Sequence, residues 1–297
     1  MWDIYLSLTG LLLLLTLLPK IQNSHWIFRV PEFGKIQITY AVLFTFILGF
    51  FIGHTEHMLY SQGLLALLFV HHGVTLVKYT PLYPVKKHRQ QNESSQKLHF
   101  ISANVYQFNK EYDKFIKLIE KYSPEIFLTM ESNGNWEQAM KVLEKDYPFQ
   151  HKVTLENTYG MHFYSKIEIE SANTHYFVAD DIPSIEVHLK TEDGFSFVFF
   201  GVHPPPPSPT EEETSKERDG DLLSTAKRVK DIHEPVIVVG DFNNVAWSKS
   251  SIKKKNESFN RSQDRAFVCV YVSRQIPSSE VSDRPDVPQR RYFYQRA

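Results

Sequence analysis

The stretch Val236-Ile-Val-Val-Gly-Asp-Phe-Asn243 decides the fold of this 297-residue chain. Its β-branched residues are typical of a buried strand, and they give way abruptly to Gly-Asp-Phe-Asn. Similar transitions occur upstream, because Asn104, Glu131 and His203 each stand at the end of an apolar run. Four predicted strands therefore deliver a carboxamide or an ionisable group at their carboxyl ends.

Helices are predicted between these strands, which indicates an α/β fold. Tyr112, Phe115, Ile116 and Ile119 follow the spacing of one face of an amphipathic helix. The pattern predicts strands at 98–105, 126–130, 159–164, 167–177, 185–189, 195–202 and 236–239, and helices at 112–123, 136–143 and around 222–229. This order favours two packed sheets with helices outside and a shared edge where the strand-end side chains meet.

The strand-end residues form an all-oxygen set that suits a hard divalent cation. Carboxylates at Glu131 and Asp241 with carboxamides at Asn104 and Asn243 match the ligands that Mg²⁺ or Mn²⁺ prefers. His203 adds a side chain that can move a proton near neutral pH. The alternative is that these residues only begin loops and cap helices, as Asn and Asp often do.

The same residues carry a resemblance to a known family. The chain from 98 to 248 resembles the endonuclease/exonuclease/phosphatase superfamily, whose domain is a four-layer α/β/β/α sandwich that hydrolyses phosphoesters. The stretches that carry it are Ile101-Ser-Ala-Asn-Val105, Pro124-Glu-Ile-Phe-Leu-Thr-Met-Glu131, Tyr159-Gly-Met-His-Phe-Tyr-Ser165, His203 before a proline run, and Gly240-Asp-Phe-Asn243 followed by Trp247-Ser248.

The resemblance implies a role for each strand-end residue. Glu131 would bind the divalent cation, Mg²⁺ or Mn²⁺, and Asn104 would support the metal and the phosphate. His203 would contact the scissile phosphate or protonate the leaving oxygen. Asp241 and Asn243 would orient the attacking water and the phosphate oxygens, and Asp241 is also expected among the metal ligands. Arg218 receives no site role.

The pattern breaks after the Gly-Asp-Phe-Asn motif. The family domain closes with a Ser-Asp-His triplet, whereas this chain carries Ser282-Asp-Arg-Pro285 and no histidine after His233. Residues 249–297 hold 11 basic and 5 acidic side chains and read as a basic divergent tail. We therefore expect an incomplete sandwich and an impaired hydrolase, with a shifted frame, a premature end or a solvated arm as explanations. A non-catalytic membrane-bound binding protein is the alternative function.

Residues 1–79 are expected to form a membrane domain with three helices, followed by a linker at 80–97. Apolar runs at 4–18, 36–53 and 58–77 each approach the ~20 residues that cross a bilayer. A cleaved signal peptide is the alternative for the first run, but no Lys or Arg precedes it and no small-residue cleavage site follows it. The arrangement resembles bacterial membrane-anchored members of the superfamily.

Basic residues in the short loops predict the orientation. Three lie between the first two runs, namely Lys20, Arg29 and Lys35, and none lies between the second and third. Four follow the third run, namely Lys78, Lys86, Lys87 and Arg89. The positive-inside rule then places the hydrolase domain in the cytoplasm, on a multi-pass protein of the inner membrane. His71 and His72 within the third run are either packing residues or a haem or proton site.

Composition limits the partners. The single cysteine excludes an internal disulfide. Residues 97–248 carry 15 basic against 25 acidic side chains, a balance of −10, which disfavours long nucleic acid as substrate. The expected partners are the lipid bilayer and a phosphoester whose identity the sequence leaves open, as it does the oligomeric state.

Overall fold

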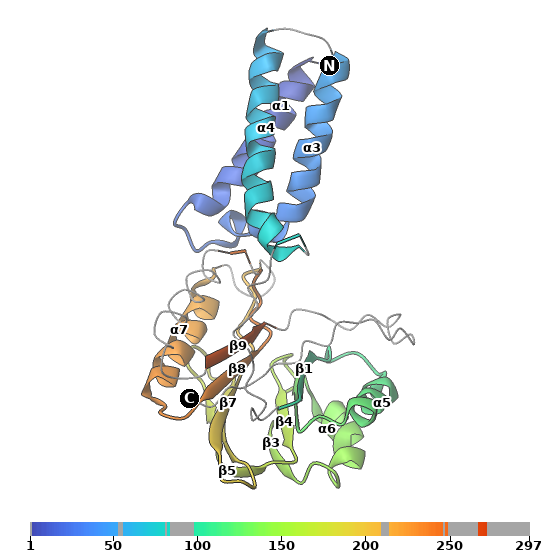
Figure 1. Ribbon diagram of the computed structural model, residues 1–297, viewed down its shortest axis with the longest axis vertical. Helices are drawn as coiled ribbons and strands as arrows, with labels where there is room; N and C mark the ends of the chain where they lie inside the picture. The colour runs from blue at the N-terminus through green and yellow to red at the C-terminus, as the bar shows by residue number, and fades with distance from the viewer. Residues whose placement is uncertain are drawn as a thin grey trace. The chain divides into compact units, whose positions relative to one another are not determined.

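The computed structural model of the protein describes residues 2–52, 56–80, 82–83, 98–208, 214–245 and 247–248, and the backbone of 267–271. The chain divides into two compact units. The first contains the long N-terminal helices together with the described parts of Pro206–Lys216 and Asn244–Lys254. The second contains the sheets, drawn in green to red in Figure 1.

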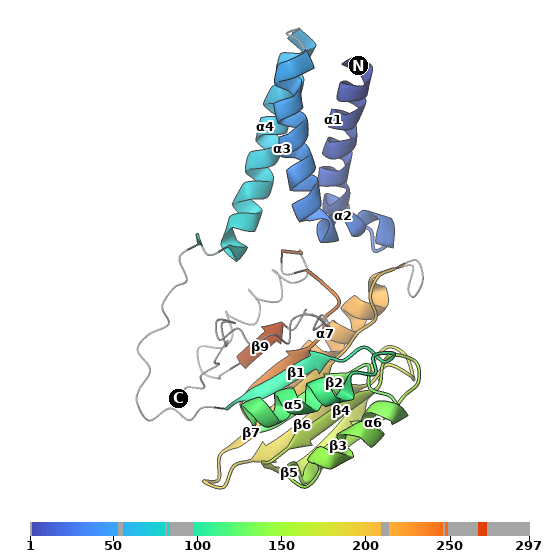
Figure 2. The ribbon, with the colours of Figure 1, turned by 90° about the vertical axis from the view of Figure 1, so that its right-hand side faces the viewer.

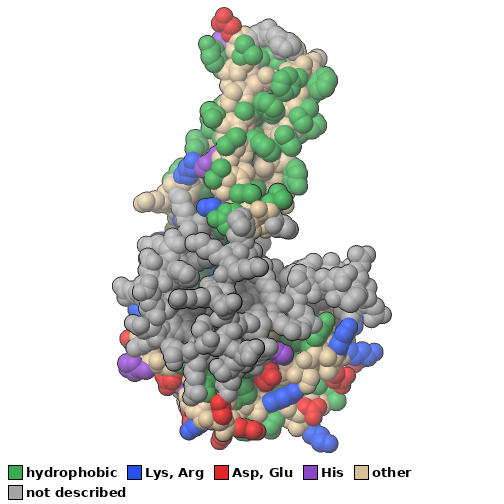
Figure 3. All heavy atoms as spheres, viewed as in Figure 1, with side chains coloured by type: hydrophobic (Ala, Val, Ile, Leu, Met, Phe, Trp, Pro, Cys, Tyr) green, Lys and Arg blue, Asp and Glu red, His purple; other side chains and the backbone are tan. Residues whose placement is uncertain are grey.

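Three helices of the first unit are long and apolar enough to cross a membrane. They are α1 (Trp2–Leu17), α3 (Lys35–Ile52) and α4 (Glu56–Leu76), and α4 is followed by a 3-10 turn, η3 (Val77–Tyr79). Their outward side chains are apolar, as Figure 3 shows, and Phe51 is 81% exposed. Exposed apolar side chains on helices of this length suit a lipid environment.

A histidine links the three helices inside the first unit. His72 is 2% exposed, its Nε2 lies 3.1 Å from Thr16 Oγ1 and its Nδ1 lies 2.9 Å from Thr39 Oγ1. Both ring nitrogens thus have partners on neighbouring helices, which supports the packing interpretation of this residue.

The connector, residues 18–34, joins α1 to α3. It consists of η1 (Leu18–Lys20), η2 (Trp26–Phe28) and a single helical turn, α2 (Val30–Phe33). His25 precedes η2, and its Nδ1 accepts a hydrogen bond from Ile27 N at 3.3 Å. Most of the predicted linker at 80–97 lies outside the described residues.

The second unit contains two sheets with helices on their outer faces (Figure 2). The first sheet has the order β1 (Phe100–Asn104), β2 (Ile126–Met130), β4 (Met161–Ser165), β3 (Phe149–Val153). The second has the order β5 (Glu168–His175), β6 (Ser184–Lys190), β7 (Ser196–Val202), β8 (Val236–Gly240), β9 (Phe267–Tyr271). The helices are α5 (Tyr112–Tyr122), α6 (Gly134–Met140) with η4 (Lys141–Leu143), and α7 (Lys216–Asp231).

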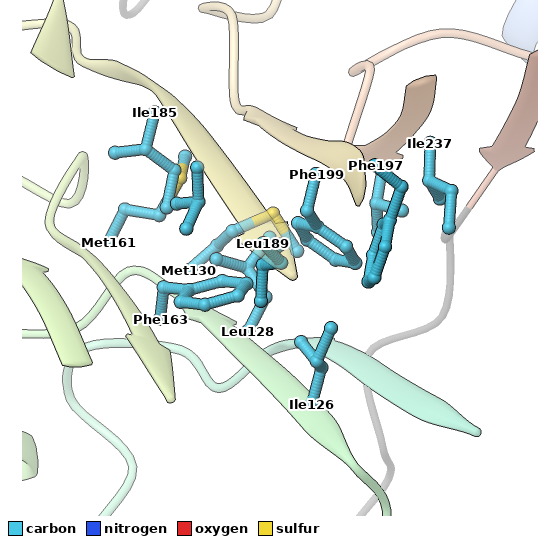
Figure 4. Close-up of a cluster of buried hydrophobic side chains, with 12 residues drawn as sticks. Ile126, Leu128, Met130, Met161, Phe163, Ile185, Leu189, Phe197, Phe199 and Ile237 are labelled. Atoms are coloured by element: carbon cyan, nitrogen blue, oxygen red, sulfur yellow. The ribbon is translucent and has the colours of Figure 1, made fainter. Parts of the chain in front are cut away.

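Three apolar clusters hold these layers together. The largest lies between the sheets and includes Leu128, Phe163 and Phe199, all 0% exposed (Figure 4). A second joins α5 and α6 to the first sheet, and a third joins α7 to the second sheet. Because burying one Leu or Phe side chain contributes ~1.5–3 kcal/mol, these clusters fix the order of layers. The predicted α/β/β/α sandwich is confirmed.

One strand lies within the segment expected to be a divergent tail. β9 pairs in parallel with β8, and Val236 is opposite Phe267 in the register. The sandwich therefore continues past the Gly-Asp-Phe-Asn motif by at least this strand. The other residues of 249–297 lie outside the described part of the chain.

A charged cluster lies between α7 and the second sheet. Glu186 of β6 has a fully buried side chain, and its oxygens accept hydrogen bonds from Arg228 Nε and Nη2 at 2.8 Å each. The Nε2 atoms of His175 and His188 also lie 2.8 Å from this carboxylate. Burial alone would raise the pKa of Glu186, but hydrogen bonds from Arg228, His188 and His175 outweigh it and lower the pKa to about 2.

Candidate functional site

The first sheet brings Asn104 and Glu131 together. β1 and β2 run in parallel with Asn104 opposite Met130, so that both side chains stand at the same end of the sheet. Asn104 Nδ2 donates a hydrogen bond to Glu131 Oε1 at 2.5 Å. Tyr106 N donates to Asn104 Oδ1 at 3.0 Å, which fixes the orientation of the amide. The first two predicted site residues are therefore in direct contact.

The second sheet brings His203, Asp241 and Asn243 to its own carboxyl end. β7 and β8 are parallel with Val202 opposite Gly240, so His203 and Asp241 follow neighbouring positions. Asn243 N donates to Asp241 Oδ1 at 3.0 Å, and Asn243 Nδ2 donates to the carbonyl of Pro204, next to His203, at 2.9 Å. Asn243 therefore connects the turn after β8 both to Asp241 and to the residue that follows His203.

Gly240 allows the two strands to approach this closely. Its φ is +156°, and a Cβ atom at this position would lie 1.8 Å from the carbonyl oxygen of Val202. Any side chain would push β7 and β8 apart directly below His203 and Asp241.

A contact between the sheets joins the two groups. Asp241 N lies 3.1 Å from the sulfur of Met130, the residue immediately before Glu131. The pair Asn104–Glu131 and the pair Asp241–Asn243 therefore belong to the same end of the sandwich. The structure gives each pair a direct hydrogen bond and connects the pairs through Met130.

The backbone at this end adopts left-handed conformations at residues that are not glycine. Tyr106, Glu131 and Asn243 have φ of +57°, +57° and +45°. Each such residue costs of order 1–3 kcal/mol and persists only where surrounding contacts hold it, and such positions cluster at functional sites. The strain coincides with two of the predicted site residues.

His203 lies among the loops at this end. It is 4% exposed, and its ring centroid is 5.5 Å from that of Tyr159. The adjoining Gly160 is held against the turn after Glu131, because Ser132 N donates to Gly160 O at 2.9 Å and a Cβ on Gly160 would lie 2.0 Å from Ser132 O. The loop beside His203 is thus fixed to the loop beside Glu131.

Arg218 belongs to this region, although the sequence interpretation gave it no role. It is 3% exposed, its Nη1 donates to Asn243 O at 3.4 Å, and its Nε and Nη2 lie 3.3 and 3.2 Å from Asp219 Oδ1. The signal in the sequence was one arginine four positions before the helix predicted around 222–229. Sequence spacing alone could not show that this arginine meets Asn243.

The oxygen atoms of Glu131 and Asn104 suit a cation such as Mg²⁺ that takes its other ligands from substrate and water. Within the described residues, no three or more His, Cys, Asp or Glu side chains are grouped to hold a metal ion. Mg²⁺ commonly uses only one or two carboxylates, completed by water and substrate phosphate. Glu131 with the carboxamide of Asn104 can supply this part, because an ionised carboxylate accepts several bonds beyond the one from Asn104.

The sequence matches a known protein family. Residues 101–283 match the pattern of the Endonuclease/Exonuclease/phosphatase family. The chain belongs to this family. The match includes all the strand-end residues described above, from Asn104 to Asn243, and it extends over β9.

Several solved structures are similar to this chain. TDP2 of D. rerio, complexed with a single-strand DNA product, is 16% identical over 51% of this chain and 63% of its own, with a TM-score of 0.45. The human Nocturnin catalytic domain with bound sulfate is 16% identical over 55% and 71%, also with a TM-score of 0.45. ANGEL2, a 2′,3′-cyclic phosphatase, is 15% identical over 58% and 61%, with a TM-score of 0.42. The chain thus spans about 63% of the length of D. rerio TDP2. No curated protein matches the sequence.

Proposed function

We propose that this protein is a membrane-anchored phosphoester hydrolase that depends on Mg²⁺ or Mn²⁺. One observation carries the proposal: the Asn104–Glu131 and Asp241–Asn243 pairs are connected through Met130 at one end of a family sandwich. Oxygen ligands beside a histidine are the set that in-line displacement at phosphorus requires. The three apolar helices support the anchoring.

Each residue has a role that follows from its position. Glu131, oriented by Asn104, would hold the cation, which neutralises charge on the phosphoryl group when bound. Asp241 would orient the attacking water and add a ligand, and Asn243 would position the phosphate oxygens. His203, already buried beside Tyr159, would contact the phosphate or protonate the leaving oxygen.

The proposed substrate is a phosphodiester or a phosphomonoester. A balance of −10 over residues 97–248 disfavours long nucleic acid, because a binding surface for many phosphates gains from basic residues. The first experiment is hydrolysis of bis-(p-nitrophenyl) phosphate by the full chain in detergent, with Mg²⁺, with Mn²⁺ and with chelator. Activity that is equal with and without chelator would contradict the proposed metal dependence.

Metal binding makes a separate prediction for Glu131. Millimolar Mg²⁺ or Mn²⁺ should raise the melting temperature of the wild-type protein, because a ligand that binds only the native state stabilises it by mass action. In Glu131→Gln most of this shift should disappear, since the ligand charge is lost while the side chain keeps its size. Glu120→Gln, the same change on the exposed face of α5, should keep the shift. An equal shift in all three proteins would exclude Glu131 as a ligand.

The orientation also makes a prediction. A reporter enzyme fused after Lys97 should be active as a cytoplasmic protein, and one inserted at Thr55 should be active outside, because the basic residues lie in the connector and after α4. The measurement is the activity of compartment-specific reporters at the two sites. The reverse pattern would move the catalytic unit to the other side of the membrane.

A second candidate is a non-catalytic membrane-bound protein that binds a metal or a partner. It is favoured by Ser282-Asp-Arg-Pro285, in which Arg284 stands where the resemblance expects a histidine. A wild-type chain that shows the metal-dependent thermal shift but no hydrolysis would support this candidate. Hydrolysis gained on Arg284→His would then identify the missing base.

A further inference from the structure

Two exposed aromatic side chains lie beside the candidate site, on the loop between β1 and α5. Tyr106 is 49% exposed and Phe108 is 65% exposed, and their rings meet edge-on with centroids 5.6 Å apart. The loop leaves β1 at Asn104, whose Oδ1 accepts the hydrogen bond from Tyr106 N. Two residues of chain span at most ~7 Å, so the backbone of Tyr106 lies next to the pair Asn104–Glu131. An edge-on contact covers only one ring face, and the exposed fractions show that the pair is open to solvent.

The loop that carries this pair is held by a buried amide. Gln107, between the two aromatic residues, is 6% exposed. Its Nε2 donates to Glu156 O at 2.8 Å, and its Oε1 accepts from Thr158 N at 2.8 Å. The polar side chain of the tripeptide 106–108 is therefore buried and both aromatic side chains are exposed. This is the reverse of what contact with water alone favours, because aromatic residues are ordinarily the more buried class.

The backbone of the loop is strained at the first aromatic residue. Tyr106 has φ of +57°, a left-handed conformation that is uncommon for a bulky side chain. The surroundings that hold it are themselves fixed, because the Glu156 carboxylate accepts hydrogen bonds from Gly134 N at 3.0 Å and from Asn133 Nδ2 at 3.2 Å. Strain of this kind costs ~1–3 kcal/mol and is found mainly at functional sites. The chain thus holds an exposed tyrosine in a defined position at the edge of the candidate site.

We propose that Tyr106 and Phe108 form a stacking subsite that binds a planar aromatic ring of the substrate. The ring would belong to the phosphoester whose phosphate lies at Asn104 and Glu131, so the inference rests on the proposed function and names its substrate class. Flat rings, nucleobases among them, gain from stacking on Tyr and Phe. The acidic balance of residues 97–248 disfavours a long polyanion, so the expected substrate is a small phosphoester with an aromatic or heteroaromatic group, such as a nucleotide.

Binding of phosphonates tests the subsite without requiring turnover, because their C–P bond is not a phosphoester. Phenylphosphonate, cyclohexylphosphonate and methylphosphonate carry the same anionic group on a flat ring, a puckered ring and no ring. Each is titrated against the full chain in detergent with Mg²⁺, and the rise in melting temperature gives its dissociation constant. The wild-type protein should bind phenylphosphonate roughly two- to tenfold more tightly than cyclohexylphosphonate, the usual gain from one aromatic contact beyond its buried area.

A double variant, Tyr106→Asn with Phe108→Leu, should remove this preference. Asparagine tolerates the left-handed backbone and leucine keeps an apolar side chain, so the loop should keep its conformation. The variant should bind the phenyl and cyclohexyl compounds equally, and its dissociation constant for methylphosphonate should match the wild type. Tyr122→Leu is the control, because it removes a tyrosine that is 45% exposed at the other end of α5. The control should keep the preference for the flat ring.

The outcomes separate the subsite from the proposed function. Equal binding of the phenyl and cyclohexyl compounds by the wild type would overturn the subsite, and so would a preference that the double variant retains. Tighter binding of cyclohexylphosphonate would overturn it in favour of an aliphatic substrate. A preference lost in the double variant, without hydrolysis of bis-(p-nitrophenyl) phosphate by the wild type, would support the subsite and reject the proposed hydrolysis. Binding of none of the three compounds would overturn the subsite and leave the hydrolysis assay to decide the function.

Discussion

Replacing Asp241 by asparagine should lower the Mg²⁺-dependent kcat on bis-(p-nitrophenyl) phosphate by about 10²- to 10³-fold, the usual loss when one preorganised electrostatic group is removed. The variant is chosen because asparagine keeps an acceptor oxygen for Asn243 N, which now bonds Asp241 Oδ1 at 3.0 Å. The turn should therefore survive while the charge that orients water and cation is lost. The measurement is kcat at saturating Mg²⁺ together with the melting temperature.

Asp113→Asn is the matched control for this result. Asp113 is exposed in the first turn of α5, where its charge contributes ~0.3–1 kcal/mol through the helix dipole, so the same change there should leave kcat unchanged and lower the melting temperature only slightly. If Asp241→Asn retained the wild-type rate, Asp241 would not belong to the machinery. If it lost activity and also unfolded, the loss would be structural.

The largest expected loss of stability comes from Glu186→Gln. This change leaves Arg228, His175 and His188 around a buried amide instead of a carboxylate. Breaking a fully buried ion pair costs ~3–5 kcal/mol, but the Arg228 side chain is 39% exposed, so we expect about 2–3 kcal/mol of the free energy of unfolding. Urea unfolding in detergent, followed by circular dichroism, measures the difference.

The pH dependence of this difference has a defined sign. The pKa of Glu186 is lowered to about 2 in the folded protein from an ordinary value near 4.5, so its stabilisation is complete above pH ~4.5. This stabilisation is lost as the pH falls through the folded pKa. The difference in free energy of unfolding between the wild type and Glu186→Gln should therefore narrow from pH ~4.5 towards ~2.

Glu170→Gln serves as the control, because Glu170 pairs with Lys190 at 3.3 Å and both side chains are more than 40% exposed. This pair should contribute only ~0–1 kcal/mol. Equal destabilisation by the two changes would refute the special role of the buried cluster.

The sequence predicted those elements whose apolar pattern reflects burial. The spacing from Tyr112 to Ile119 corresponds to α5, and the run 126–130 coincides with β2, because each buries a continuous face. β3 escaped prediction because Phe149-Gln-His-Lys-Val153 is an edge strand, half-buried at every position, without alternation. β9 carries an apolar run, Phe267-Val-Cys-Val-Tyr271, but it follows a long polar stretch that suggested a tail.

For the candidate site, the sequence was enough to name the residues at strand ends but not the residues that contact them from distant parts of the chain. Strand ends are local features, so Asn104, Glu131 and Asp241 could be named from the pattern alone. Arg218 contacts the backbone of Asn243, which is 25 positions away in the sequence. Contacts across such separations depend on how loops close, which no local periodicity records.

The parallel pairing of β8 with both β7 and β9 has a consequence for synthesis. At 5–20 residues per second, Tyr271 is added about 2 to 6 s after Gly240, since 31 positions separate them. β8 and β9 leave the ribosome in the same order with about the same delay, and during that delay the outer edge of β8 has no partner within its own chain. An unpaired apolar edge is a template for neighbouring nascent chains, and crowded polysomes bring such edges together. Yield in a heterologous host should therefore depend on the translation speed of the codons after residue 240 more than on codons anywhere upstream.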